Sequence, residues 1–211
     1  ADATVTEGNT AYSLAGATYN VYEGTTASGT VVATFTTDSS GHATINPPLP
    51  NGTYAVKETK APPGYKLDPE IHVFTINGSD TSLDLQDDPG DMLIRVDKKD
   101  SDLNQSTPQG NASLAGAVYR VTYQKNGTTV TEEITSDENG HFPLLQNIPF
   151  GTVTIQEISS PPGYKMDTEI HTYNIRPGAS VEDAYELVPD DITEDVQRGG
   201  LTIQKKDSQT G

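Results

Sequence analysis

The chain has 211 residues, of which 33% are hydrophobic, 19 are glycine and 14 are proline, and it contains no cysteine. Its 30 acidic and 13 basic residues give a net charge of −17, which excludes nucleic acid as an expected partner because such a surface repels phosphate. No apolar run is long enough to cross a membrane, and no signal peptide is evident. The composition favours two small β-rich domains with thin cores, which need a staple other than a disulfide if they work outside a cell.

The sequence contains an internal repeat. Three motifs occur twice in the same order: SLAGA at 13–17 and 113–117, D-x-x-G-H at 38–42 and 137–141, and PPGYK at 62–66 and 161–165. The offset is 100 for the first motif (113−13) and 99 for the other two (137−38 and 161−62). Because order and spacing are kept, the chain is expected to hold a duplicated domain.

Each copy is predicted to consist of short strands. Apolar residues alternate at 17–21 and 117–121, and again along 54–58 and 153–157, where the last inward position is a glutamate. The D-x-x-G segments have hairpin-turn chemistry, and turn signals recur about every ten residues, as in a sandwich. No segment shows a convincing helical period, so we expect an all-β fold of tandem immunoglobulin-like β-sandwiches.

The two ends of the sequence extend this pattern. Residues 201–207, LTIQKKD, repeat the pattern of IRVDKKD at 94–100, which predicts the first strand of a third module. Residues 7–9 match 109–111, a position that follows the first strand of a unit. We therefore expect residues 1–90 to form a module lacking its first, lysine-bearing strand, 91–198 to form a complete module, and 199–211 to begin a third.

The motif set resembles the Cna B-type, prealbumin-like modules of Gram-positive surface proteins and pilins. The resemblance depends on SLAGA, on the strands that end in Glu58 and Glu157, on the Pro-Pro-Gly-Tyr that follows each, and on the first strand with Lys98 and Asp100. It implies a prealbumin-like β-sandwich in which a first-strand lysine is joined by an isopeptide bond to an Asn or Asp of the last strand. A glutamate in a middle strand promotes that reaction.

The resemblance assigns roles to particular residues. In the second unit Lys98 is the expected nucleophile and Glu157 the expected catalytic acid, and in the last strand, within 185–194, Asp190 is the expected acceptor with Asp191 as the fallback. In the first unit the matching residues are Glu58 and Asp87, but no lysine precedes position 57. Lys205 is the matching lysine of the third module.

The chemistry of such a bond agrees with the strand pattern. Lys98 shares a strand face with Val96, so its side chain should point inward, where burial favours the neutral, nucleophilic amine. Glu157 follows the alternation of Val153 and Ile155, so it should also face the core, where a raised pKa lets it hold a shared proton. An ordinary buried salt bridge, or a lysine that extends to the sandwich edge, remains an alternative.

Other candidate sites have weaker support. Asp38 and Asp137 lie in loops without the alternating carboxylates of a calcium site, so we interpret them as turn residues. The four histidines, at positions 42, 72, 141 and 171, would bind metal only if loops converged, and structural or exposed roles are expected. We therefore expect no metal and no cofactor.

The function predicted from these observations is that of a structural stalk or spacer of an adhesin or pilin-like protein on a bacterial cell surface, cell-wall anchored through a region outside this sequence. The only chemistry expected is self-cross-linking, so the protein is not expected to be an enzyme; paired-carboxylate hydrolysis is least favoured because the acids face a core. Short linkers at 89–90 and 198–200 favour the stalk. The alternative is an adhesive module that binds a host extracellular ligand directly.

The expected partners are the neighbouring modules of the same chain. Self-association is also predicted: the segment 200–211 of one molecule would dock into the first unit of another, with Lys205 able to bond to Asp87. A disordered tail is the alternative.

Overall fold

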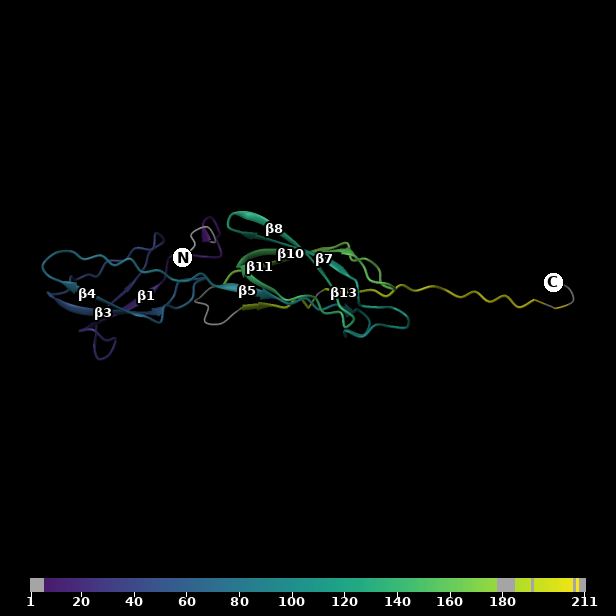
Figure 1. The fold of residues 1–211 in the computed structure, drawn as a ribbon, viewed down its shortest axis with the longest axis horizontal. Helices are drawn as coiled ribbons and strands as arrows, with labels where there is room; N and C mark the ends of the chain where they lie inside the picture. The colour runs from purple at the N-terminus through teal and green to yellow at the C-terminus, as the bar shows by residue number, and fades with distance from the viewer. Residues whose placement is uncertain (1–5, 178–184, 191, 207, 209–211) are drawn as a thin grey trace.

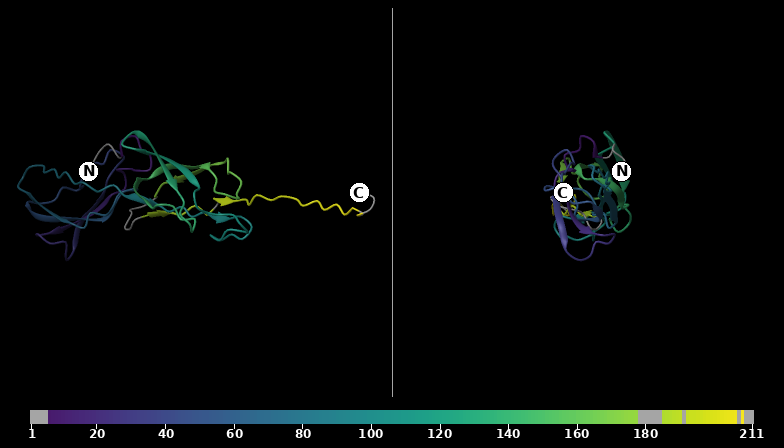
Figure 2. Two further views of the ribbon diagram at one scale, coloured as in Figure 1. Left: turned by 45° about the vertical axis from the view of Figure 1, so that its right-hand side comes forward. Right: turned by 90° about the vertical axis from the view of Figure 1, so that its left-hand side faces the viewer.

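A computed structural model describes residues 6–177, 185–190, 192–206 and 208 of the chain. The named elements are all β-strands, arranged in two units placed end to end and followed by an extended tail (Figure 1). The left view in Figure 2 shows the same elongated form, and the right view looks along its long axis. Within the described ranges, no helix is long and apolar enough to cross a membrane.

Unit one is built on a single four-stranded antiparallel sheet in the order β2-β1-β3-β4. Its strands are β1 (Thr18–Glu23), β2 (Val31–Thr36), β3 (Gly52–Lys60) and β4 (Ile71–Ile76). Tyr19 and Val21 of β1 pair with Glu58 and Val56 of β3, and all four side chains are buried on one face. The predicted alternation therefore brings Glu58 to the inner face of the sheet.

Unit two repeats this sheet and adds a second one. The first sheet has the order β11-β10-β7-β8, from β7 (Val118–Lys125), β8 (Thr128–Thr135), β10 (Gly151–Ser159) and β11 (Ile170–Ile175). The second has the order β12-β5-β9, from β5 (Asp91–Ile94), β9 (Leu145–Pro149) and β12 (Tyr185–Leu187). A short parallel pair of β6 (Lys99–Asp100) and β13 (Thr193–Glu194) extends it.

The core of unit two lies between these sheets. Met92, Ile94 and Val96 of the first-strand segment are at most 1% exposed, and they belong to one buried cluster with Val121 and Ile155 of the opposite sheet. Burial of each such side chain contributes about 1.5–3 kcal/mol to folding. The same alternation continues to Lys98, which is therefore turned into the core, as expected. The chain is thus an all-β protein with two sandwich-type units in tandem.

Unit one has less cover over its inner face. In unit two the middle strand β5 pairs with both β9 and β12. Among the described residues of unit one there is no such second sheet, and residues 46–50, which match β9 at the offset of 99, are in no strand. The apolar residues Ile45, Leu49 and Leu85 cover the inner face and are themselves only partly buried.

The two units are joined by a packed contact. Tyr12 is 8% exposed, and its hydroxyl donates to the Gly90 carbonyl at 2.7 Å and accepts from the Phe150 amide at 3.0 Å. Its ring centroid lies 5.6 Å from that of Tyr65 and 5.8 Å from that of Phe150. One side chain thus connects unit one, the linker and unit two.

Candidate cross-linking site

A lysine lies fully buried between the sheets of unit two. Lys98, which directly follows the first-strand segment, is 0% exposed. Its Nζ donates to Glu157 Oε1 at 2.7 Å and to the Tyr119 hydroxyl at 3.1 Å, and it also contacts Glu194 Oε1. A buried amine thus lies between two carboxyl groups that are themselves at most 2% exposed.

Strand register positions the groups around this lysine. In β10 the alternation of Val153 and Ile155 turns Glu157 inward, and Tyr119 of β7 lies directly opposite it in the antiparallel ladder. Glu194 reaches the same point because its strand, β13, pairs in parallel with β6, and β6 begins directly after Lys98. The site therefore joins the beginning of the unit, its middle and its end.

The electrostatics favour a shared proton. Burial raises the pKa of Glu194 to about 7, although Lys98 acts in the opposite direction, and the nearby charge of Glu157 raises it further. Burial and the negative charge of Glu194 also raise the pKa of Tyr119, so its hydroxyl stays a donor. At neutral pH the site can therefore hold an uncharged carboxyl group against an amine, which is the pair that an amide-forming condensation needs.

The loop after β10 fixes Glu157 from its other side. Glu157 Oε2 accepts a 2.6 Å hydrogen bond from the backbone amide of Asp167. The Asp167 carboxylate in turn pairs with His171 Nε2 at 2.7 Å and accepts from the Glu169 amide at 2.8 Å. Asp167 and His171 therefore hold the loop that orients the glutamate.

The structure places an acid other than Asp190 against the lysine. Asp190 is exposed and makes no contact with Lys98, and Asp191 lies outside the described residues. The residue against the lysine is Glu194, because β12 ends at Leu187 and the chain returns to the site only at β13. Sequence reasoning did not single out Glu194, because it considered only Asp190 and Asp191 in the last segment.

A spacing signal in the sequence identifies Glu194. Asp87 precedes Lys98 by 11 residues (98−87), and Glu194 precedes Lys205 by the same 11 (205−194). Backbone hydrogen bonds give the same alignment. Lys66 N donates to Asp88 O at 2.9 Å in unit one, and Lys165 N donates to Asp195 O at 2.8 Å in unit two, so the residue after each acid accepts an equivalent hydrogen bond. Glu194 and Asp87 are therefore equivalent.

The described residues of unit one include the acids of the site but place no lysine beside them. Glu58 is 1% exposed, and its Oε2 accepts from the Asp68 amide at 2.8 Å, as Glu157 does from Asp167. Glu58 Oε1 and Asp87 Oδ1 are buried and have no hydrogen-bond partner among the described residues. Burial, reinforced by the charge of Glu58, raises the pKa of Asp87 to about 7.

Lys205, the lysine that the sequence assigns to a third module, does not lie near Glu58 and Asp87. It is exposed in the tail that follows unit two, close to Leu201 and Ile203, which are 85% and 80% exposed. The structure therefore brings Glu58 and Asp87 together and leaves Lys205 apart from them.

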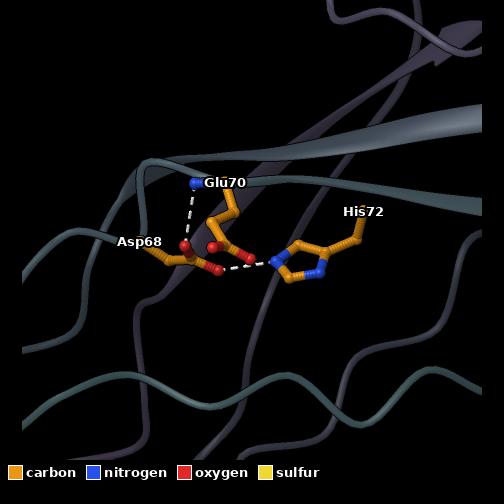
Figure 3. Close-up of side chains that lie close together, drawn as sticks. All are labelled: Asp68, Glu70 and His72. Atoms are coloured by element: carbon orange, nitrogen blue, oxygen red, sulfur yellow. Dashed lines mark hydrogen bonds and ion pairs between the residues drawn. The ribbon is translucent and has the colours of Figure 1, made fainter.

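One group among the described residues has metal-ligand character. Asp68, Glu70 and His72 place their ligand atoms within 4.8 Å of one another (Figure 3). Asp68 already pairs with His72 Nε2 at 2.6 Å and accepts from the Glu70 amide at 2.8 Å. Since Asp167 makes the same two contacts in unit two, the cluster is explained by the loop that orients Glu58.

The remaining candidate residues stabilise turns or pair with a neighbouring segment. Asp38 accepts from the amides of Ser40 and His42, and Asp137 accepts in the same way within its own turn. His141 pairs with Asp97 at 2.7 Å, which connects the turn to the first-strand segment. The aspartates are therefore occupied as turn residues.

Comparison with known proteins agrees with this architecture. A family model described as SpaA, prealbumin-like fold domain, matches residues 3–89 and 94–186. The solved structure of the Bacillus anthracis TIE protein is similar at 24% identity with a TM-score of 0.58, and the match covers 88% of this chain but only 32% of that protein. Its identity and score establish a shared fold.

Weaker matches include a streptococcal ancillary pilin, at 18% identity and a TM-score of 0.33, with 87% of this chain and 58% of that one covered. The minor pilin of Streptococcus agalactiae matches at 17% identity and a TM-score of 0.36, with 90% and 87% covered. A search of curated proteins finds no match. On the two matches of the family model, the chain belongs to the family of SpaA prealbumin-like fold domains and carries two of them in tandem.

Proposed function

We propose that this chain is a spacer segment of an adhesin or pilin-like protein on the surface of a Gram-positive bacterium, and that its second unit locks itself with an amide bond between Lys98 and Glu194. The observation that carries the proposal is the fully buried Lys98 amine in contact with both Glu194 and Glu157. Burial of three ionisable side chains costs free energy that an ordinary structural role does not require. A single-turnover condensation uses all three.

Each group has a distinct part in this condensation. Glu157 takes a proton from the Lys98 ammonium group, and the neutral amine attacks Cδ of the protonated Glu194 carboxyl group. A C–N bond forms, the amine loses its second proton, and one C–O bond of Glu194 breaks. Glu157 carries the proton to the departing hydroxyl, so one water molecule leaves and no other reactant is consumed.

The surroundings of Glu194 suit this step. Its Oε1 accepts from the Tyr119 hydroxyl at 2.9 Å, a donor that can stabilise negative charge on this oxygen as the amine adds. Its Oε2 is buried and has no hydrogen-bond partner among the described residues. Because an amide keeps only one carboxyl oxygen, the reaction removes a buried polar atom that is costly to leave unpaired.

The bond would give unit two mechanical strength. It links residues 96 positions apart, and the loop-entropy model for cross-links gives about 4–5 kcal/mol for a loop of that size. It also joins the first-strand segment to β13, so a pulling force enters and leaves the unit through the bond. The packed Tyr12 contact between the units supports the same spacer role.

Pulling the chain from its ends tests this function. With the bond formed, unit two should contribute only the few residues outside 98–194 to the extension. The Lys98→Met variant should release nearly the whole unit. Equal extension in both proteins would reject the locked spacer.

A further inference from the structure

The outward face of the unit one sheet carries a row of apolar residues that unit two lacks. We propose that this face is a docking surface for a partner protein, and that it binds a segment in which a carboxylate stands beside apolar side chains. The Lys57 amine takes the carboxylate, and Tyr22, Val31 and Val73 take the apolar side chains. Unit one then binds a partner in addition to acting as a spacer.

Strand register defines the row. Tyr22 of β1 pairs with Val31 of β2 and with Ala55 of β3, and Ala55 pairs with Val73 of β4. These four residues, called the outer row, therefore cross the whole sheet on one line. Their side chains point away from the core, because neighbours in the sequence such as Val21 point inward and side chains alternate along a strand.

The outer row is exposed at its two ends and closed at its middle. Val31 and Val73 are 40% and 47% exposed. Ala55 is 0% exposed and yet is no member of the inner cluster of unit one, because the larger Tyr22 and Val73 flank it in the ladder. Ile71, the next outward residue of β4, is 45% exposed and extends the surface. The described residues thus form a continuous apolar patch.

Unit two has threonine at every equivalent position. Thr122 pairs with Thr131 and with Thr154, and Thr154 pairs with Thr172. The fold therefore does not require apolar residues on this face, since threonine is also favoured in strands. Contiguous apolar patches on a protein surface mark sites of interaction. The contrast between the two units assigns such a contact to unit one.

The charge of the face specifies the chemistry of the partner. The row of outward residues beside the outer row contains no acid and a single lysine, Lys57, on a chain whose net charge is −17. Lys57 lies between Asn20 and Ile71 in the ladder and has no ion pair with a described residue. In unit two the charged residue of the equivalent row, Arg120, is paired with Glu133 at 3.0 Å. A carboxylate from a partner would give Lys57 the same kind of pair.

The dimensions of the face fit a short polypeptide segment. Neighbouring strands lie about 4.8 Å apart, so the outer row is about 14 Å long, and Lys57 lies about 7 Å to one side of Ala55. An extended segment of about five residues covers that length at about 3.3 Å per residue. An Asp or Glu side chain of such a segment can reach Lys57 while its neighbours lie on the outer row.

Two other occupants fit this face less well. A second copy of the chain carries the same net charge of −17, and a symmetric contact between two such faces would bring Lys57 against Lys57. Binding to anionic lipid takes a cluster of about four to eight basic residues, whereas these two rows contain one lysine. A partner protein with an acidic and apolar segment is therefore favoured.

Peptide selection on the full-length chain tests the proposal. A phage library of random dodecapeptides is selected on the chain, with the Tyr22→Thr, Val31→Thr, Val73→Thr variant in solution to remove peptides that bind elsewhere. This variant gives unit one the threonines of unit two and should keep its strands. The enriched peptides should carry Asp or Glu beside apolar residues, and the synthetic peptides should bind the threonine variant at least about tenfold more weakly.

Two single substitutions separate charge from apolar contact. Lys57→Gln introduces the residue that unit two has at the equivalent position, Gln156 (156−57 is the offset of 99). It should weaken peptide binding about tenfold and remove its dependence on salt concentration. Ile170→Thr, which removes an exposed apolar residue from the equivalent face of unit two, is the matched control and should leave binding unchanged.

The opposite outcomes are equally specific. Failure to enrich any peptide, enrichment of peptides without acids, or equal binding to the threonine variant overturns the proposal. A dimer of the chain, or binding to phosphatidylserine vesicles, that is lost in the threonine variant also overturns it, because each identifies a different occupant. These measurements do not depend on the Lys98–Glu194 bond, whose failure is seen separately in the mass of the chain.

Discussion

The Lys98 amine lies 2.7 Å from the Glu157 carboxylate, and the exposed fractions of these side chains are 0% and 1%. Lys98 lies between β5 and β6, Glu157 comes from β10, and a third buried group, Glu194, contacts the same amine. Two acids beside one amine can share a proton, and this is the composition that the proposed condensation requires.

Glu157→Gln should prevent the amide bond. The amide side chain of Gln keeps the size of the glutamate but cannot take the proton from Lys98, so the amine stays charged and unreactive. Intact-mass measurement on the denatured protein should give the full sequence mass. Glu58→Gln, the equivalent change in unit one, is the matched control and should keep the loss of water in unit two; loss of the bond in both variants would contradict the assignment.

Glu194→Ala should abolish the bond, whereas Asp190→Ala should leave it intact. The reason is position: Glu194 is buried against Lys98, and Asp190 is exposed. The same mass measurement, followed by peptide mapping, distinguishes the two. If Asp190→Ala removed the bond and Glu194→Ala did not, the acceptor assignment from the structure would be wrong.

Asp167→Ala should slow bond formation without preventing folding. The change removes the contacts to His171 and to the Glu169 amide, so the loop whose backbone orients Glu157 is held less firmly. The measured quantity is the half-time of water loss after refolding, which should lengthen several-fold. Asp68→Ala makes the same change in unit one and should leave that half-time unchanged; an equal delay in both would indicate a general folding effect.

Unit one should lose stability as the pH rises from about 4 to 7. The folded-state pKa of Asp87 is raised to about 7, above an unfolded value of about 3.9, so its protonated form favours the folded state. The contribution is complete below the unfolded pKa and is lost as the pH passes through the folded pKa.

Urea unfolding followed through NMR signals of β1 and β3 measures this dependence. Asp87→Asn should flatten the pH profile, and Asp88→Asn at the neighbouring exposed residue should not. A profile that Asp87→Asn leaves unchanged would refute the role of this carboxyl group.

Much of this arrangement follows from the sequence alone. The repeat offset and the strand alternation predict an all-β tandem fold, and they turn Lys98, Glu157 and Glu58 inward because side chains alternate strictly along a strand. Those expectations concern regular elements, where local periodicity determines direction.

The position of Glu194 beside Lys98 was harder to predict because no strand alternation leads to it. Glu194 lies 30 residues after Tyr164, whereas Asp87 lies 22 residues after Tyr65 (194−164 and 87−65). A position counted forward from the motif with the spacing of unit one therefore falls short of Glu194. Pairing of β13 with β6 sets the position of Glu194, and that long-range contact is not visible in local pattern. The packed contact of Tyr12 with Phe150 was missed for the same reason.

The mass of the denatured, full-length chain at low protein concentration tests the central claim most directly. If Lys98 and Glu194 are condensed, the monomer should be one water lighter than its sequence, and fragmentation should yield one branched peptide that joins these two residues. A monomer of unaltered mass, with Lys98 and Glu194 recovered in separate unmodified peptides, would contradict the account and leave the buried cluster as a salt bridge.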